Sequence, residues 1–195
     1  LAFPHYELFH NDTESPFHAF TIGTVRFIVS DVRSESTDTS VFSDIQREWL
    51  RVELEAADSY DFVVWVTTKP WIGSPETHND AWRGQPGERA LVSEWISNVS
   101  SQNVLAVSAD AHMVAFDDGS HTYYGENGDD STRYSFPILQ SGPLSQKGSI
   151  KGGPFTDGCY MVRGITHQYS TISFEFDDEP CLDIRSYRVR DDGNK

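Results

Sequence analysis

The chain has 195 residues, of which 37% are hydrophobic and 13% aromatic, and its formal net charge at pH 7 is -15. This length is usual for a single domain with one hydrophobic core. The acidic balance argues against nucleic acid as a partner, because a phosphate backbone is bound by clustered Lys and Arg. No apolar run approaches the roughly 18 residues of a membrane-spanning helix. We therefore expect one domain, or part of one, with no membrane span.

Two features are typical of secreted proteins, a pair of cysteines and two glycosylation sequons. The chain contains two cysteines, Cys159 and Cys181, and a disulfide closing a loop of this length would contribute about 3 kcal/mol in an oxidising compartment. Asn11 and Asn98 each begin an N-glycosylation sequon. The sequence begins without an initiator Met or a signal peptide, as a processed protein or a fragment would. We predict a Cys159–Cys181 disulfide, glycosylation at Asn11 and Asn98, and a secreted or extracellular location.

Short, β-branched apolar runs predict three strands, at residues 25–29, 62–66 and 104–107. Each run is nearly unbroken, and such runs suit strands that are buried on both faces of a sheet. We expect the three strands to be adjacent and largely parallel.

Two helices are predicted between these strands, at residues 44–56 and 87–98. Ser43 begins the first with a capping-box pattern, and Pro86 stands at the start of the second. The apolar positions at helical spacing are Ile45, Trp49, Val52 and Ala56 in the first helix, and Leu91, Val92, Trp95 and Val99 in the second. At this spacing Trp49 and Trp95 are expected to be core residues.

The sequence changes character after Gly125. Loop-forming residues dominate at 126–130 and 141–153, and three β-type segments follow at 160–165, 171–176 and 182–189. We interpret residues 1–125 as a βαβαβ portion. Residues 126–195 are interpreted as loops and an antiparallel β-meander that closes the sheet.

Polar residues follow each predicted strand. Asp31 and Arg33 follow the first strand, and Asp110 and His112 follow the third. The residues after the second strand are Thr67, Thr68, Lys69, Pro70 and Trp71, of which Thr68 is expected near Asp31 and Arg33. In open α/β sheets, ligands bind outside the carboxyl ends of the strands. A D-x-H pair at a strand end can offer oxygen and imidazole to a metal ion. The alternative for Asp110 and His112 is a turn Asp beside an exposed His.

Four short motifs resemble those of the PhoD-like phosphatases, in the same order. They are Phe17-His18-Ala19-Phe20 with Gly23, the 25–29 strand and Asp31-Val32-Arg33; Gln46-Arg47-Glu48-Trp49-Leu50; Asp80-Ala81-Trp82-Arg83-Gly84 through Glu88-Arg89; and Ser108-Ala109-Asp110-Ala111-His112. The resemblance implies part of a calcineurin-like metallophosphoesterase sandwich, in which helices flank two sheets. It also implies a site for divalent or trivalent metal ions, iron and calcium by family resemblance.

The resemblance assigns roles to five residues. Asp110 and His112 are the implied metal ligands and catalytic residues, with Asp110 either a ligand or the group that orients one. Arg33, Asp80 and Trp82 are the implied substrate-binding residues, and a guanidinium suits phosphate oxygens. The alternatives are a structural ion pair of Arg33 with Glu88 or Asp31 and a loop-packing role for Asp80 and Trp82.

Some residues depart from the family pattern or lack a role. Ala109 replaces the family's Gly, which would strain the backbone if that position needs a positive φ. His78, His121 and His167 lie in polar segments and are interpreted as surface residues.

The family's first metal ligands, which precede the matched region, are not found in this sequence. Two hypotheses follow. In the first, the chain is the carboxy-terminal half of a metal-dependent phosphatase domain, whose partners are the amino-terminal half of the same domain and a phosphate mono- or diester substrate. In the second, it is a non-catalytic extracellular structural or assembly module that kept the scaffold.

Overall fold

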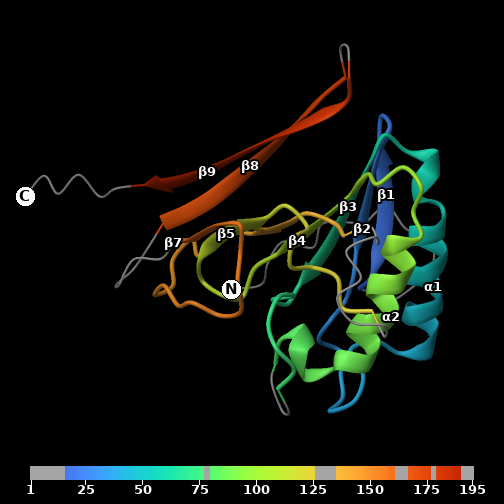
Figure 1. Ribbon diagram of the computed structural model, residues 1–195, viewed down its shortest axis with the longest axis horizontal. Coiled ribbons are helices and arrows are strands. Elements are labelled where there is room, and N and C mark those ends of the chain that lie inside the picture. Colours follow the sequence, from blue (N-terminus) through green and yellow to red (C-terminus); the bar gives the residue numbers. More distant parts are fainter. Residues whose placement is uncertain (1–15, 77–79, 126–134, 161–166, 177–178, 190–195) are drawn as a thin grey trace, which may run out of the picture.

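The computed structural model describes residues 16–76, 80–125, 135–160, 167–176 and 179–189. The described strands form a seven-stranded mixed sheet and a separate two-stranded ribbon. Helices α1 (Asp44–Glu55) and α2 (Pro86–Ser97) lie side by side along the sheet, and the ribbon lies away from them (Figure 1). No helix in the described ranges has the length and apolar character to span a membrane.

The large sheet is parallel at its centre and antiparallel at its edges. In spatial order its strands are β1 (His18–Ile22), β2 (Val25–Val29), β3 (Phe62–Thr68), β4 (Val104–Ser108), β6 (Ile138–Gln140), β5 (Val114–Asp117) and β7 (Asp157–Tyr160). β2, β3, β4 and β6 pair in parallel, whereas β1 and β5 pair antiparallel with their neighbours. The prediction of three adjacent parallel strands is therefore confirmed.

Both helices begin as predicted, but α1 buries a different face. The Ser43 side chain accepts a hydrogen bond from the Gln46 N–H, which caps the helix. Ile45 is 77% exposed and Val52 is 51% exposed, so the predicted stripe was wrong. Gln46 is buried instead, because its side-chain amide hydrogen-bonds both the N–H and the carbonyl of Asp31. These two bonds fix the rotation of the helix against the end of β2.

The two tryptophans that were expected in the core lie at its margin. Trp49 and Trp95 are partly buried and pack against the main hydrophobic cluster. In α2 the fully buried apolar positions are Val92 and Ile96, and Leu91 is 43% exposed.

Strand β3 is covered on both faces. Val63 and Trp65 belong to the cluster that includes helix residues such as Leu50. Phe62 and Val64 belong to a second cluster, which takes in the ribbon. Alternation along a strand sends successive side chains to opposite faces, so one apolar run packs against helices on one side and strands on the other.

The predicted β-meander is only partly present. β8 (His167–Glu175) and β9 (Cys181–Val189) pair antiparallel with each other as a separate sheet, whereas β7 pairs with β5 at the edge of the large sheet. Phe174 and Leu182 on the ribbon pack against the face of the sheet. The ribbon therefore covers a face and does not close an edge, and Phe174 and Leu182 are partly buried by this packing. Of the first predicted segment, 160–165, all residues after Tyr160 lie outside the described ranges.

The predicted disulfide is wrong, because Cys159 and Cys181 are free cysteines. Cys159 lies in β7 and packs against a small cluster that contains Met113. Cys181 begins β9, where it stands opposite Glu175 of β8. The prediction assumed that the strands carrying both cysteines were neighbours in one meander, and they belong to separate sheets.

The two sequons differ in what the structure describes. Asn98 lies immediately after α2 and is exposed, so its side chain is accessible for glycosylation. Its modification stays a prediction. Asn11 lies outside the described residues.

Candidate active site at the carboxyl edge of the sheet

Charged side chains from three loops meet at the carboxyl edge of the parallel strands. The Arg33 guanidinium lies 3.3 Å from the Asp110 carboxylate and 2.5 Å from the Asp80 carboxylate. Lys69, which directly follows β3, lies 3.7 Å from the other oxygen of Asp80. The hydrogen bond from Arg33 lowers the pKa of Asp80 below its ordinary value, and burial opposes this effect. Parallel pairing explains the convergence, because it sets the ends of β2, β3 and β4 along one edge.

A tight turn after β2 positions Arg33. The Asp31 carboxylate accepts hydrogen bonds from the N–H groups of Arg33 and Ser34, each at 3.0 Å. The backbone of Asp31 is in turn bound by the Gln46 amide on α1. Burial raises the pKa of Asp31, but the hydrogen bonds from Ser34 and Arg33 outweigh it and hold the pKa below its ordinary value. The start of the Arg33 loop is thus tied to helix α1.

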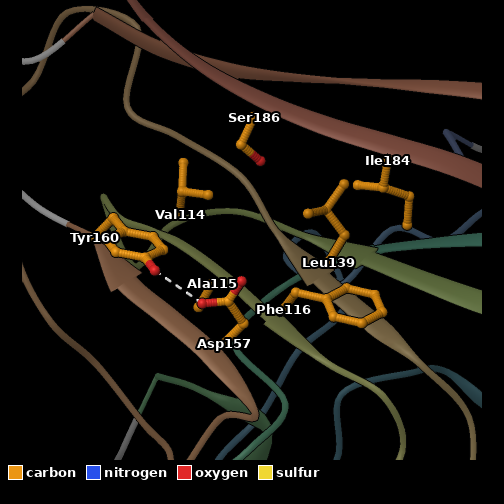
Figure 2. A pocket seen from close by; sticks show the side chains of 8 residues that line it. All are labelled: Val114, Ala115, Phe116, Leu139, Asp157, Tyr160, Ile184 and Ser186. Atoms are coloured by element: carbon orange, nitrogen blue, oxygen red, sulfur yellow. Dashed lines mark hydrogen bonds between the residues drawn. The ribbon is translucent and has the colours of Figure 1, made fainter.

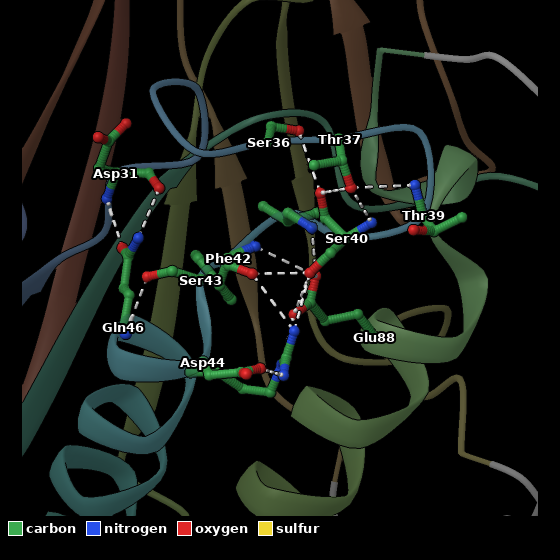
Figure 3. Close-up of polar contacts among 12 residues, drawn as sticks. Asp31, Ser36, Thr37, Thr39, Ser40, Phe42, Ser43, Asp44, Gln46 and Glu88 are labelled. Carbon is green, nitrogen blue, oxygen red and sulfur yellow. Dashed lines mark hydrogen bonds and ion pairs between the residues drawn. The ribbon is translucent and has the colours of Figure 1, made fainter.

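Glu88 in the first turn of α2 anchors the end of the same loop (Figure 3). Its buried carboxylate accepts hydrogen bonds from the N–H groups of Val41 and Phe42 and from Nε of Arg47. The alternative that Arg33 forms a structural ion pair with Glu88 is therefore wrong, because Arg47 occupies that carboxylate.

Arg89 anchors the loop that follows β3. Its buried guanidinium donates to the carbonyl oxygens of Trp71, at 2.9 Å, and Gly73, at 2.8 Å, and lies 3.6 Å from the centre of the Tyr124 ring. Burial lowers the pKa of Arg89 to about 10. The adjacent residues Glu88 and Arg89 thus fix the loops that carry Arg33 and Lys69. The sequence motif alone gave them no role.

The end of β4 is strained at two residues. Asp110 and His112 have φ values of 59° and 52°, in the left-handed region that non-glycine residues seldom adopt. Such backbone conformations concentrate at functional sites. Ala109 is not among the residues with positive φ, so replacing the family's Gly with Ala causes no strain at that position.

A neighbouring loop fixes the imidazole of His112. Nδ1 of His112 lies 3.0 Å from the carbonyl oxygen of Lys147. A carbonyl oxygen only accepts, so Nδ1 donates its N–H to it, and in the neutral imidazole Nε2 then keeps its lone pair. The same loop places Nζ of Lys151 3.4 Å from the carboxylate of Asp110, and the Ser149 hydroxyl donates to the carbonyl of Ala111. From the sequence, residues 141–153 were predicted only as a connection. Every residue has a backbone carbonyl, so no residue type could indicate the contact between His112 and the carbonyl of Lys147.

Trp82 does not line the site. Its side chain is fully buried, and its indole N–H donates to the Thr67 hydroxyl at 2.6 Å. It packs edge-on against Trp65 and Phe42 in the core. The substrate-binding prediction for Trp82 was therefore wrong, and the packing alternative describes it. Asp80, two residues earlier, has a side chain that is 67% exposed.

Two cavities adjoin the charged cluster, and Asp80 lines both. The larger, about 370 Å³, is also lined by Arg33, Lys69, Ser36 and Thr37. The smaller, about 170 Å³, contains Asp110 and Lys151 in its lining. A molecule bound at this edge would therefore meet charged and hydroxyl side chains.

A further cavity of about 390 Å³ lies between the large sheet and the ribbon (Figure 2). Apolar side chains such as Leu139 and Ile184 line it, and the carboxylate of its Asp157 accepts a hydrogen bond from Tyr160 at 2.8 Å. This cavity shares no lining residue with the 370 Å³ cavity at the carboxyl edge, and neither Arg33 nor Lys69 lines it.

In the part of the chain that the structure describes, no group of three or more His, Cys, Asp or Glu residues could hold a metal ion. Asp110 and His112 are two potential ligands and do not by themselves form such a group. His121 was interpreted as a surface residue without a partner. Its ring is partly exposed, but Nδ1 lies 2.6 Å from the buried carboxylate of Asp117. His78 lies outside the described residues.

No protein-family model matches this chain, and no curated protein matches it. A solved structure titled "Structure of PhoD" is similar, with a TM-score of 0.58 and 15% sequence identity. The match covers 90% of this chain and 44% of that chain, so the chain spans less than half the length of this PhoD. At this identity the similarity shows a PhoD-like fold.

Proposed function

We propose that this chain is the carboxy-terminal part of a PhoD-like phosphoesterase domain, which hydrolyses phosphate mono- or diesters with bound metal ions. The observation that carries the proposal is the 3.3 Å contact between Arg33 and Asp110 at the carboxyl edge of a PhoD-like sheet. The contact joins the D-x-R and D-x-H motifs in one site.

Arg33 is the residue best suited to bind the phosphate. Two N–H groups of its planar guanidinium match two phosphate oxygens, and Lys69 adds a second positive charge nearby. A protein with a net charge of -15 repels phosphate over most of its surface. A phosphate substrate therefore requires cations close to its binding site, and Arg33 and Lys69 supply them.

Asp110 and His112 are the residues that would hold a metal ion. The His112 ring fits this role, because the Lys147 carbonyl fixes its tautomer and leaves Nε2 as the ligand atom. Asp110 would exchange its contacts with Arg33 and Lys151 for the cation. A bound cation of this class activates water and neutralises charge on the phosphate. We infer that the remaining ligands belong to the amino-terminal half of the domain, and that the metals are iron and calcium.

The test is an assay of the full-length natural protein with p-nitrophenyl phosphate and bis(p-nitrophenyl) phosphate. We expect hydrolysis of at least one ester, its loss after dialysis against a chelator, and its return when metal is restored. A folded protein that hydrolyses neither ester in the presence of iron and calcium would contradict the proposal. The non-catalytic scaffold hypothesis would then take its place.

A further inference from the structure

The carboxylate of Asp80 is shared between two cations. Its Oδ2 lies 2.5 Å from Nη1 of Arg33, and its Oδ1 lies 3.7 Å from Nζ of Lys69. One oxygen faces each cation, as two oxygens of a phosphate group would. The carboxylate therefore stands where an oxyanion bound by both cations would lie.

Lys69 is poorly compensated for its burial. Its side chain is only 2% exposed, and its ammonium donates to the Ser36 hydroxyl at 3.3 Å. The 3.7 Å separation from Asp80 is longer than a good charge-assisted hydrogen bond. Burial accordingly lowers the pKa of Lys69 below its ordinary value. A buried ammonium is costly unless it is closely paired, so Lys69 would gain from a nearer anion.

Asp80 can leave this position at little cost. Its side chain is 67% exposed, and exposed ion pairs contribute little to stability because water solvates both partners. The adjoining cavity, about 370 Å³, also presents the hydroxyls of Ser36 and Thr37. Asp38 lines it too. Asp110 contacts both Arg33 and Lys151, so three cations (Arg33, Lys69 and Lys151) face three acids (Asp38, Asp80 and Asp110) at this edge. When Asp80 turns to solvent, the cations are in excess by one.

We propose that Arg33 and Lys69 form a binding site for a phosphate group, and that Asp80 is a built-in competitor that occupies the site when phosphate is absent. The inference rests on the proposed function, in that the bound anion would be the phosphoryl group of the substrate or the phosphate product. Lys69 is then a substrate-binding residue, and the return of Asp80 assists release of the product.

The experiment measures binding of inorganic phosphate to the full-length protein, after removal of metals with a chelator, by isothermal titration calorimetry at fixed ionic strength. Asp80→Asn keeps the shape of the side chain and removes its charge, so phosphate should bind about tenfold more tightly. Lys69→Met removes the buried cation, so phosphate should bind about tenfold more weakly.

Each variant has a matched control. Asp44→Asn removes the same charge from an exposed carboxylate, which lies 2.6 Å from Arg47 on α1. Arg185→Met removes an exposed cation, which pairs with Asp183 on the ribbon. Both controls should stay within about twofold of the wild-type affinity, because distant exposed charges are screened.

The inference is overturned if Asp80→Asn binds phosphate no more tightly than Asp44→Asn, or if a folded Lys69→Met variant binds it as well as Arg185→Met. If circular dichroism shows that Lys69→Met is unfolded, the phosphate affinity of Asp80→Asn alone decides whether the inference holds. The proposed function is tested separately by turnover. If the variants alter phosphate binding as expected but the protein hydrolyses no ester, the phosphate-binding site is supported and the proposed enzymatic function is contradicted. If the protein hydrolyses esters but the variants leave phosphate binding unaltered, the enzymatic function is supported and the inference about Asp80 and Lys69 is overturned.

Discussion

The carboxylate of Asp110 lies 3.3 Å from the guanidinium of Arg33, although Arg33 follows β2 and Asp110 follows β4. Strand β3 lies between these two strands in the sheet, so the contact spans the width of three strands. The turn at Asp31 positions Arg33. A backbone with positive φ at the end of β4 positions Asp110. The contact thus depends on the loops as well as on the sheet.

Glu88 should be essential for stability. Glu88→Gln leaves Arg47 without its buried carboxylate partner and weakens the bonds to the loop that carries Val41. We expect a loss of about 2–4 kcal/mol in the free energy of unfolding, measured by urea denaturation. The control is Glu48→Gln, which removes an exposed ion pair with Arg51 and should cost less than about 0.5 kcal/mol. Equal losses in both variants would show that Glu88 is not an anchor.

Asp31 should contribute to the acid sensitivity of folding. Its pKa is lower in the folded protein than its ordinary value of 3.8, so its contribution is full above the unfolded-state pKa and disappears as the pH falls through the folded-state pKa. Asp31→Asn keeps an oxygen for the Arg33 N–H but removes the titration. The stability difference between wild type and Asp31→Asn should therefore be constant above about pH 5 and shrink below about pH 4. A difference that grows on acidification would refute this sign.

Cys159 and Cys181 should both be free thiols. Cys181 is exposed and Cys159 is partly buried, and burial raises the pKa of both thiols above the ordinary value. Titration with a thiol reagent should label both cysteines after denaturation without reductant, and Cys181 faster than Cys159 in the native protein. Labelling that requires prior reduction would indicate a disulfide.

The central fold was predictable from sequence because its signals are local. Unbroken apolar runs such as 62–66 mark strands buried on both faces, and Ser43 marks a helix start. The arrangement of the last strands was not predictable in the same way. The alternation in β8 indicates which of its side chains face away from solvent, but it does not specify whether the ribbon packs on a face or pairs with an edge.

Only the site residues that directly follow predicted strands could be predicted from the sequence. Arg33 and Asp110 follow buried strands, so their meeting follows from parallel pairing. The role of the Lys147 carbonyl depends on the path of a loop with no periodic pattern, and burial of Trp82 depends on tertiary packing around the Thr67 hydroxyl. A short motif contains neither kind of information.

The metal content of a His112→Ala variant of the full-length protein tests the central claim most directly. Metal per chain would be measured by mass spectrometry after gel filtration, with thermal unfolding to confirm that the variant is folded. The control is His167→Ala at the start of β8, outside the carboxyl-edge cluster. We predict that His112→Ala loses metal affinity by at least about tenfold while His167→Ala keeps it. Equal metal content in wild type and folded His112→Ala would contradict the assignment of this edge as a metal-dependent phosphoesterase site.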